Sequence, residues 1–308
     1  MSERMPVIID CDGGADSLWG LAVAASSPQL ELAAVTVTAG KQSAENAFAN
    51  AAAYAALLGL RCPLYRGSER SVLLREKPVW GKDGPDGRLG MALPAPAAYA
   101  PGHAWDAIYQ AACRAEGALT VVCFGPMTNL AIALFKYEDL AEKLKKVVFV
   151  GGSYDFGNYT SVVEYNMATD PEAARAVFRS GVDRMMVGFN AMQKSALDDR
   201  LQQIVCAGGG AGAALFRQCC AGRQKTLGRV CFGGALAAAA LARPQLVQSQ
   251  RLHLELETRS SICRGRTVPI TMYYPPNFEK DTDIVMEVDR EGYAALLADA
   301  VREMEVSR

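Results

Sequence analysis

Three carboxylates crowd a short glycine turn near the start of the chain. Asp10, Asp12 and Asp16 fall within IDCDGGAD, directly after an apolar run at 6–10 and before a helical pattern. Two like charges about 4 Å apart repel by about 4 kcal/mol at an effective dielectric near 20, so a cation, a proton or a polar ligand should offset them. The other interpretation is a set of solvated acids that cap the following helix. The spacing alone leaves both open.

The pattern around this turn predicts an α/β protein. Short apolar runs rich in β-branched residues alternate with helical patterns, which indicates βαβ units and a mainly parallel sheet in a single domain, 1–308. We expect strands at 6–10, 31–38, 118–124, 146–151, 183–188, 251–258, 266–273 and 283–288. We expect helices at 43–58, 103–115, 127–135, 171–179 and from Arg290 onward, the fourth begun by Asp170-Pro171-Glu172 as N-cap, N1 and N2. In open sheets of this kind, ligands bind beyond the carboxyl ends of the strands.

Composition narrows the classes of partner. Lys and Arg total 32 against 33 for Asp and Glu, so no bulk positive field attracts nucleic acid or an anionic membrane. The start of the chain does not fit a secretory signal peptide, and the nine cysteines form no CxxC pair. We expect a cytoplasmic protein with reduced thiols. Its two histidines are too few for a histidine-rich zinc site.

Stretches along nearly the whole chain resemble the nucleoside hydrolases, in the order that the family has them. The first, VIIDCDGGADSLWGLAVAASSPQLELAAVTVTAG, is similar to the family's D-x-D-P-G-x-D-D motif and to the strand ending in A-G-N that follows it. Further matches are CPLYRGS, FGPMTNLAIAL, VVFVGGSYDFGNYTSVVEYNMATDPEAARAVF and LETRSSICRGRTV. The resemblance implies an open, mostly parallel central sheet with helices on both faces, and calcium-dependent hydrolysis of the N-glycosidic bond of ribonucleosides.

The resemblance also implies roles for individual residues. Asp12 corresponds to the family's Asp that binds calcium and accepts a proton from the metal-bound water. Asp16 corresponds to the Asp that recognises ribose hydroxyls. Asn158, Glu164 and Asn166 match the family's N-x-x-x-x-x-E-x-N ribose-binding stretch. The sugar half of the pocket is therefore expected to be intact.

The calcium ligands of the family are largely missing from this chain. The fourth motif Asp falls on Ser17, and a His-Asp pair of the family falls on Gly233 and Gly234. Asp12 is the ligating carboxylate that remains, beside a backbone carbonyl at Phe124. Because calcium takes about six to eight oxygens and usually several carboxylates, we expect no tight calcium, no metal ligands and no other cofactor.

Lys41 stands where the family has the Asn of A-G-N. An ammonium on a flexible four-carbon stem has the reach to place positive charge among Asp10, Asp12 and Asp16, where the ion of the family lies. We therefore expect the Lys41 ammonium within about 4 Å of at least one of these carboxylates. The alternative is a surface lysine that faces solvent.

Positions that face the base in the family differ as well. Trp80, in the long loop at 66–102, stands where a His-Gly dipeptide is usual, and Asn190 and Gln193 replace Asp and His. Trp80 either stacks on a planar ligand or anchors its loop by packing; we assign it to substrate binding.

These observations predict hydrolysis of a ribonucleoside or related ribosyl compound without calcium. Asp12 would act as base with the help of Lys41, and Asp16, Asn158, Glu164 and Asn166 would hold the ribose. The alternative is a non-catalytic protein that binds ribosides, and glycosyl transfer on the same scaffold also stays open. The partner is a small-molecule riboside, the process is purine or pyrimidine salvage, and the family suggests a homodimer or homotetramer.

Overall fold

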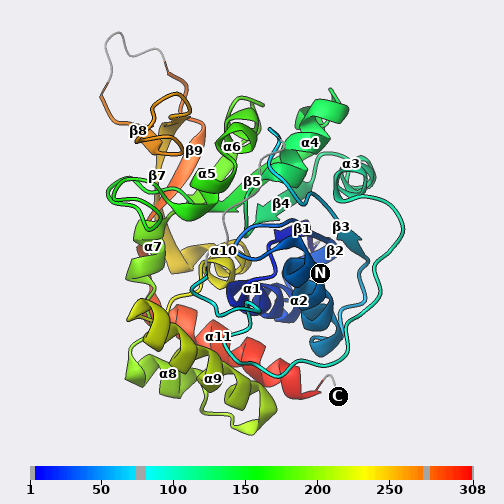
Figure 1. The fold of residues 1–308 in the computed structure, drawn as a ribbon, viewed down its shortest axis with the longest axis vertical. Helices are drawn as coiled ribbons and strands as arrows, with labels where there is room; N and C mark the ends of the chain where they lie inside the picture. The colour runs from blue at the N-terminus through cyan, green and yellow to red at the C-terminus, as the bar shows by residue number, and fades with distance from the viewer. Residues whose placement is uncertain (1–3, 74–80, 273–277, 307–308) are drawn as a thin grey trace.

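The computed structural model describes residues 4–73, 81–272 and 278–306. Its strands form one nine-stranded sheet in the order β3-β2-β1-β4-β5-β6-β9-β7-β8 (Figure 1). The strands are β1 (Met5–Cys11), β2 (Leu30–Val37), β3 (Leu64–Arg66), β4 (Leu119–Cys123), β5 (Leu144–Val150), β6 (Arg184–Val187), β7 (Val247–Leu256), β8 (Thr267–Ile270) and β9 (Thr282–Val288). Pairing is parallel from β3 across to β9, and β7 is antiparallel to both β9 and β8. The predicted mostly parallel sheet is confirmed.

Helices cover both faces of this sheet, as expected. They are α1 (Ala15–Ser26), α2 (Ala44–Leu57), α3 (Ala104–Arg114), α4 (Thr128–Lys136), α5 (Tyr165–Thr169), α6 (Pro171–Phe178), α7 (Phe189–Lys194), α8 (Asp199–Val205), α9 (Gly210–Leu227), α10 (Gly233–Ala242) and α11 (Arg290–Val306). One core packs α1, α2, α10 and α11 against the sheet, and a second packs α3, α4 and α6 against the other face. Helices α8, α9 and α11 lie at one end of the molecule, and β7 and β8 at the opposite end (Figure 1).

The central strands follow from their sequence. The second half of β1 is completely buried, which is typical of a parallel strand that is covered on both sides. Helix α6 begins as predicted: Asp170 is its N-cap, its carboxylate accepts the Ala173 N–H, and Pro171 occupies the first turn. Between β3 and α3 the described residues contain no helix or strand, which agrees with the long loop expected at 66–102.

Helix α1 and helix α10 approach each other closely. Every residue of α10 is buried, and its Ala-rich sequence leaves little side-chain bulk between the helices. A Cβ added to Gly20 in α1 would lie 2.4 Å from the Phe124 ring and 2.8 Å from the Gly234 carbonyl carbon. This close contact places the first residues of α10 near the acidic turn that precedes α1.

In the described part of the chain, no helix has the length and apolar character needed to span a bilayer.

Candidate active site

The acidic turn lies at the carboxyl end of the parallel strands, where ligands were expected. Asp12 follows β1, Lys41 follows β2, and Phe124 follows β4. Asp10, the first of the three carboxylates, is completely buried and accepts hydrogen bonds from Thr36 Oγ1 and Asn129 Nδ2, both at 2.7 Å. Asp10 therefore links the end of β1 to Thr36 and Asn129 through side-chain hydrogen bonds.

Asp12 is also buried, and donors surround its carboxylate. Oδ1 accepts from the Ser17 hydroxyl at 3.2 Å and from the Gly14 N–H at 3.3 Å, and Oδ2 accepts from the backbone N–H of Lys41 at 3.2 Å. The N-cap of α1 is Gly14, and no side chain caps that helix. The interpretation of the acids as solvated helix caps is therefore wrong. Asp12 is 1% exposed and is not among the residues that line the cavity described below.

Lys41 occupies the position expected for a substitute cation. Its Nζ lies 3.6 Å from Asp16 Oδ2, and the residue is only 7% exposed, so the surface alternative is wrong. Burial by itself lowers the pKa of this ammonium, but the carboxylates of Asp12 and Asp16 outweigh burial and raise the pKa above its usual value. Lys41 is accordingly protonated at neutral pH and offsets the charge of the acidic turn.

A buried ion pair beside this turn has no counterpart in the sequence-based expectations. Asp83, in the loop before α3, is 0% exposed and lies 3.0 Å from Nη1 of Arg223, which is 4% exposed and comes from α9. A Cβ added to Gly14 would lie 3.1 Å from Asp83 Oδ2, 3.4 Å from Lys41 Cδ and 3.5 Å from Asp12 Oδ1. Burial lowers the pKa of Arg223, but Asp83 and Asp16 outweigh it and raise that pKa overall. Asp83 and Arg223 thus extend the charged network of the site.

The predicted sugar-binding residues come together around α5. Glu164 is the N-cap of α5, and its Oε2 accepts the N–H groups of Gly152, Asn166 and Met167 at 2.9–3.2 Å. Burial raises the pKa of Glu164, and these N–H donors oppose the rise only in part. Asn158 Oδ1 accepts the Tyr165 N–H at 2.8 Å. These hydrogen bonds fix the conformation of the segment 158–167, which contains Asn158, Glu164 and Asn166.

Two acceptor oxygens of the predicted sugar-binding residues are buried without a hydrogen-bond partner. The Asn166 amide nitrogen donates to the carbonyls of Phe124 at 3.0 Å and Val150 at 2.8 Å, which leaves Oδ1 of the same amide unpaired. Asp16 Oδ2 accepts the Gly234 N–H at 3.1 Å, and Asp16 Oδ1 is unpaired. Buried acceptors normally have a donor. Both residues line one cavity, and each oxygen has the capacity to accept a hydrogen bond from a hydroxyl group.

The cavity has a volume of about 350 Å³, within the range of about 300–1,000 Å³ typical of small-molecule sites. Its wall includes all four predicted sugar-binding residues and Lys41, together with apolar and cationic side chains. These further lining residues include Val150, Phe156, Phe189, Met192, Gln193, Lys82, Arg223 and Arg229. Trp80, the remaining predicted ligand contact, lies outside the described residues.

The two altered positions in GFNAMQKSA, Asn190 and Gln193, differ in whether they line the cavity. Gln193 lines the cavity. Asn190 does not: its Oδ1 accepts from the Ser153 hydroxyl at 2.7 Å and from the Tyr154 N–H at 3.0 Å, which fixes the segment after β5. Of these two positions, the structure therefore places only Gln193 in the wall of the cavity.

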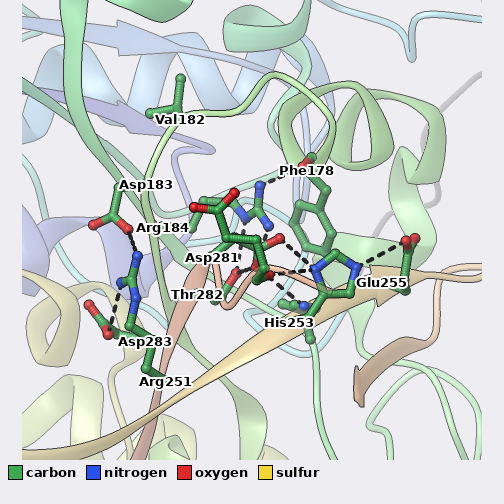
Figure 2. Close-up of polar contacts among 12 residues, drawn as sticks. Phe178, Val182, Asp183, Arg184, Arg251, His253, Glu255, Asp281, Thr282 and Asp283 are labelled. Carbon is green, nitrogen blue, oxygen red and sulfur yellow. Dashed lines mark hydrogen bonds and ion pairs between the residues drawn. The ribbon is translucent and has the colours of Figure 1, made fainter. Parts of the chain in front are cut away.

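Neither histidine of the chain lines this cavity. His103 stacks on Trp105. His253 belongs to a separate polar cluster on β7 and β9, shown in Figure 2, where its ring lies 2.9 Å from Asp281 and 3.2 Å from Glu255. Arg184 completes that cluster through Asp281, 2.7 Å away. No imidazole is therefore in place to protonate a group that leaves the cavity.

The donor set near Asp12 does not fit a calcium ion. The Ser17 hydroxyl donates to Asp12 and the Phe124 carbonyl accepts from Asn166, so these two candidate ligands are neutral oxygens that add no carboxylate charge. Gly234 has no side chain, and Lys41 already places positive charge beside Asp16. Calcium needs several carboxylate oxygens at about 2.3–2.6 Å. Within the described ranges, no group of three or more His, Cys, Asp or Glu side chains has an arrangement suited to a metal.

Comparisons with known proteins agree with the fold and the motifs. A family model described as inosine-uridine preferring nucleoside hydrolase matches residues 7–295. The pyrimidine-specific ribonucleoside hydrolases RihA and RihB from strains of Escherichia coli are 29% and 28% identical to the chain, over 97% of it and 98% of each relative.

Solved structures of other proteins have the same fold as this chain. A plant nucleoside hydrolase superposes with a TM-score of 0.88 over 97% of this chain and 99% of its own, at 24% identity. A purine-preferring ribonucleoside hydrolase from Gardnerella vaginalis superposes with a TM-score of 0.87 over 97% and 98%, also at 24% identity.

Proposed function

Because the chain belongs to the inosine-uridine preferring nucleoside hydrolase family, we propose that it hydrolyses the N-glycosidic bond of a ribonucleoside or related ribosyl compound without a calcium ion. The family assigns the chain to the enzymes that break this bond; the absence of the metal from its mechanism is the step that we add. We place the reaction in nucleoside salvage in the cytoplasm, with the protein a homodimer or homotetramer.

One observation carries the proposal: Asp16 Oδ1 and Asn166 Oδ1 are buried, unpaired acceptors in the wall of one cavity. A ribosyl group presents hydroxyl donors at close spacing, so it satisfies both oxygens at once. Asn158 and Glu164 line the same wall. Holding the sugar in this way supports a reaction that passes through an oxocarbenium-like transition state.

We assign the role of general base in this reaction to Asp12. A water oxygen bonds to the anomeric carbon while the bond from that carbon to the aglycone nitrogen breaks, and the electron pair of that bond stays on nitrogen. The water proton passes to Asp12, which acts as an ordinary general base. Since Asp12 is 1% exposed and does not line the cavity, the residues around it must shift for water to reach it. The departing aglycone takes its proton from solvent.

The position of Asp12 also favours a second candidate, a riboside-binding protein without turnover. Asp12 is 1% exposed and already accepts three hydrogen bonds. If Asp12 stays buried in this way, the pocket still binds a riboside but no base reaches the water. Both candidates share the ribosyl ligand and differ in whether product forms.

The two candidates separate in one experiment. Purified protein is incubated with a panel of purine and pyrimidine ribonucleosides in EDTA, and release of free base and of reducing sugar is measured beside ligand-induced shifts in melting temperature. Hydrolysis predicts product that is lost in Asp12→Asn while the thermal shift remains. The binding protein predicts equal thermal shifts in both proteins and no product in either. Turnover that appears only when calcium is added contradicts the metal-free mechanism.

A further inference from the structure

The cavity has a cationic wall that the sugar-binding residues leave unused. Arg223 on α9, Arg229 after α9 and Lys82 in the loop before α3 all line it. We propose that the aglycone taken by this site is a planar heterocycle that carries a negative charge at neutral pH, such as a ring carboxylate. This inference rests on the proposed ribosyl site, because it assigns to the aglycone the part of the cavity that the sugar does not fill.

Arg223 supplies the built-in part of this wall. It is 4% exposed, and its Nε is buried with no hydrogen-bond partner in the described part of the chain. Asp83 approaches one end of the guanidinium, at Nη1. A guanidinium is an always-charged fork of donors that suits carboxylates. An acceptor on the ligand would satisfy the donor that the fold leaves unpaired.

Arg229 and Lys82 add charge that the protein does not balance. Both side chains are exposed at the cavity, and neither forms an ion pair with any residue that the structure describes. The deeper cations are balanced, because Lys41 faces Asp16 and Arg223 faces Asp83. Among the side chains that line the cavity, four are cationic and two, Asp16 and Glu164, are carboxylates, so the lining has an excess of positive charge that attracts an anionic group.

The apolar part of the wall points to a flat ring. Phe156 and Phe189 lie edge to face with ring centroids 5.7 Å apart, and Met192 lines the cavity beside them. Phe156 is 42% exposed although it is a large apolar side chain. A planar heterocycle covers such rings well, since aromatic pairs stack at centroid distances of about 4.5–7 Å.

A cationic wall also suits the reaction. When the bond between the anomeric carbon and nitrogen breaks, its electron pair stays on the aglycone, which becomes more negative by one charge. With no histidine in the cavity, nearby guanidinium groups stabilise this negative charge electrostatically until a proton arrives from solvent.

The test uses two pairs of ribosides that differ by one carboxylate: orotidine against uridine, and nicotinic acid riboside against nicotinamide riboside. Dissociation constants are measured by calorimetry, and product release is followed separately. We expect the acid of each pair to bind at least about fivefold more tightly than its neutral partner, the advantage expected from about 1 kcal/mol of ion pairing. Arg229→Glu should remove that preference. Lys225→Glu is the matched control, because it makes the same charge change on α9 outside the cavity, and it should keep the preference.

The outcomes separate this inference from the proposed function. Preference for the acids without any product supports the inference and refutes hydrolysis of these ribosides. Hydrolysis of uridine with no preference for either acid refutes the inference and leaves the proposed function intact. An equal effect of Arg229→Glu and Lys225→Glu refutes the cationic wall as its cause, and failure of all four ribosides to bind refutes both proposals.

Discussion

Replacing Lys41 with Met tests whether the ammonium stands in for a metal ion. At 3.6 Å and an effective dielectric near 20, its attraction to the Asp16 carboxylate is about 5 kcal/mol before desolvation is counted. Breaking a buried pair by removing one partner typically costs about 3–5 kcal/mol, because the other charge is left uncompensated. We expect Lys41→Met to lower the free energy of unfolding by about 3 kcal/mol. For a chain of 308 residues, that loss lowers the melting temperature by about 5 °C.

The assay is denaturant unfolding of a double-mutant cycle made of Lys41→Met, Asp16→Asn and the double variant. A coupling energy of about 2–3 kcal/mol is expected for groups in direct buried contact. Lys225→Met, an exposed lysine on α9, is the control and should change stability by no more than about 0.5 kcal/mol. A coupling energy near zero, or a Lys41→Met variant as stable as its control, would refute the reasoning.

The pH dependence gives a second check on the same pair. The folded pKa of Lys41 is raised above its usual value, so its stabilisation is fully present below the unfolded pKa of about 10.4. It is lost as the pH rises through the folded pKa. The stability difference between the parent and Lys41→Met should therefore stay constant from about pH 6 to about pH 9. A difference that changes within this window would point to another group.

Four further outcomes are expected. Asn166→Ala removes the unpaired Oδ1 and should weaken riboside binding by about tenfold in calorimetry; unchanged affinity would remove Asn166 from the sugar site. Arg184→Met removes the buried guanidinium that pairs with Asp281 in the cluster of Figure 2 and should cost about 2 kcal/mol in denaturant unfolding, after allowance for the partial exposure of Asp281. Gly20→Ala should cost about 3 kcal/mol because its Cβ would lie 2.4 Å from the Phe124 ring, and a neutral result would show that α10 can move. Calcium at about 1 mM should not raise the melting temperature, whereas a clear rise would mean that a binding site exists.

Much of the architecture was predictable because local signals agreed with the fold. Apolar runs placed most strands of the parallel sheet within a few residues, and Asp170-Pro171 marked the start of α6 correctly. Short elements were missed. Helix α5 has five residues, and its N-cap is Glu164, a residue type with little preference for that position. Strand β3 has three residues and depends on pairing with β2 rather than on any pattern of its own.

The site was predictable in its motif residues and not in its long-range contacts. The resemblance placed Lys41 at the Asn of A-G-N, and the need of crowded carboxylates for a counter-charge then suggested its role. No local pattern predicts the contact between Asp83 and Arg223, since Asp83 lies in an irregular loop and Arg223 lies within a helix far along the chain. Likewise, the motif identifies Asp12 but does not predict that its side chain is buried and lies outside the cavity wall. Contacts of this kind depend on how loops pack, which local patterns do not specify.

The altered positions around the acidic turn form one compatible set. Ser17, where the family has a carboxylate ligand, donates its hydroxyl to Asp12. Lys41 donates its backbone N–H to Asp12 and holds its ammonium beside Asp16. Gly234 lacks a side chain and donates its N–H to Asp16. Ser17, Lys41 and Gly234 thus each supply a donor or positive charge to Asp12 or Asp16. These donors and the one ammonium stabilise both carboxylates, and Asp16 and Asn166 lie in the wall of the cavity beside them.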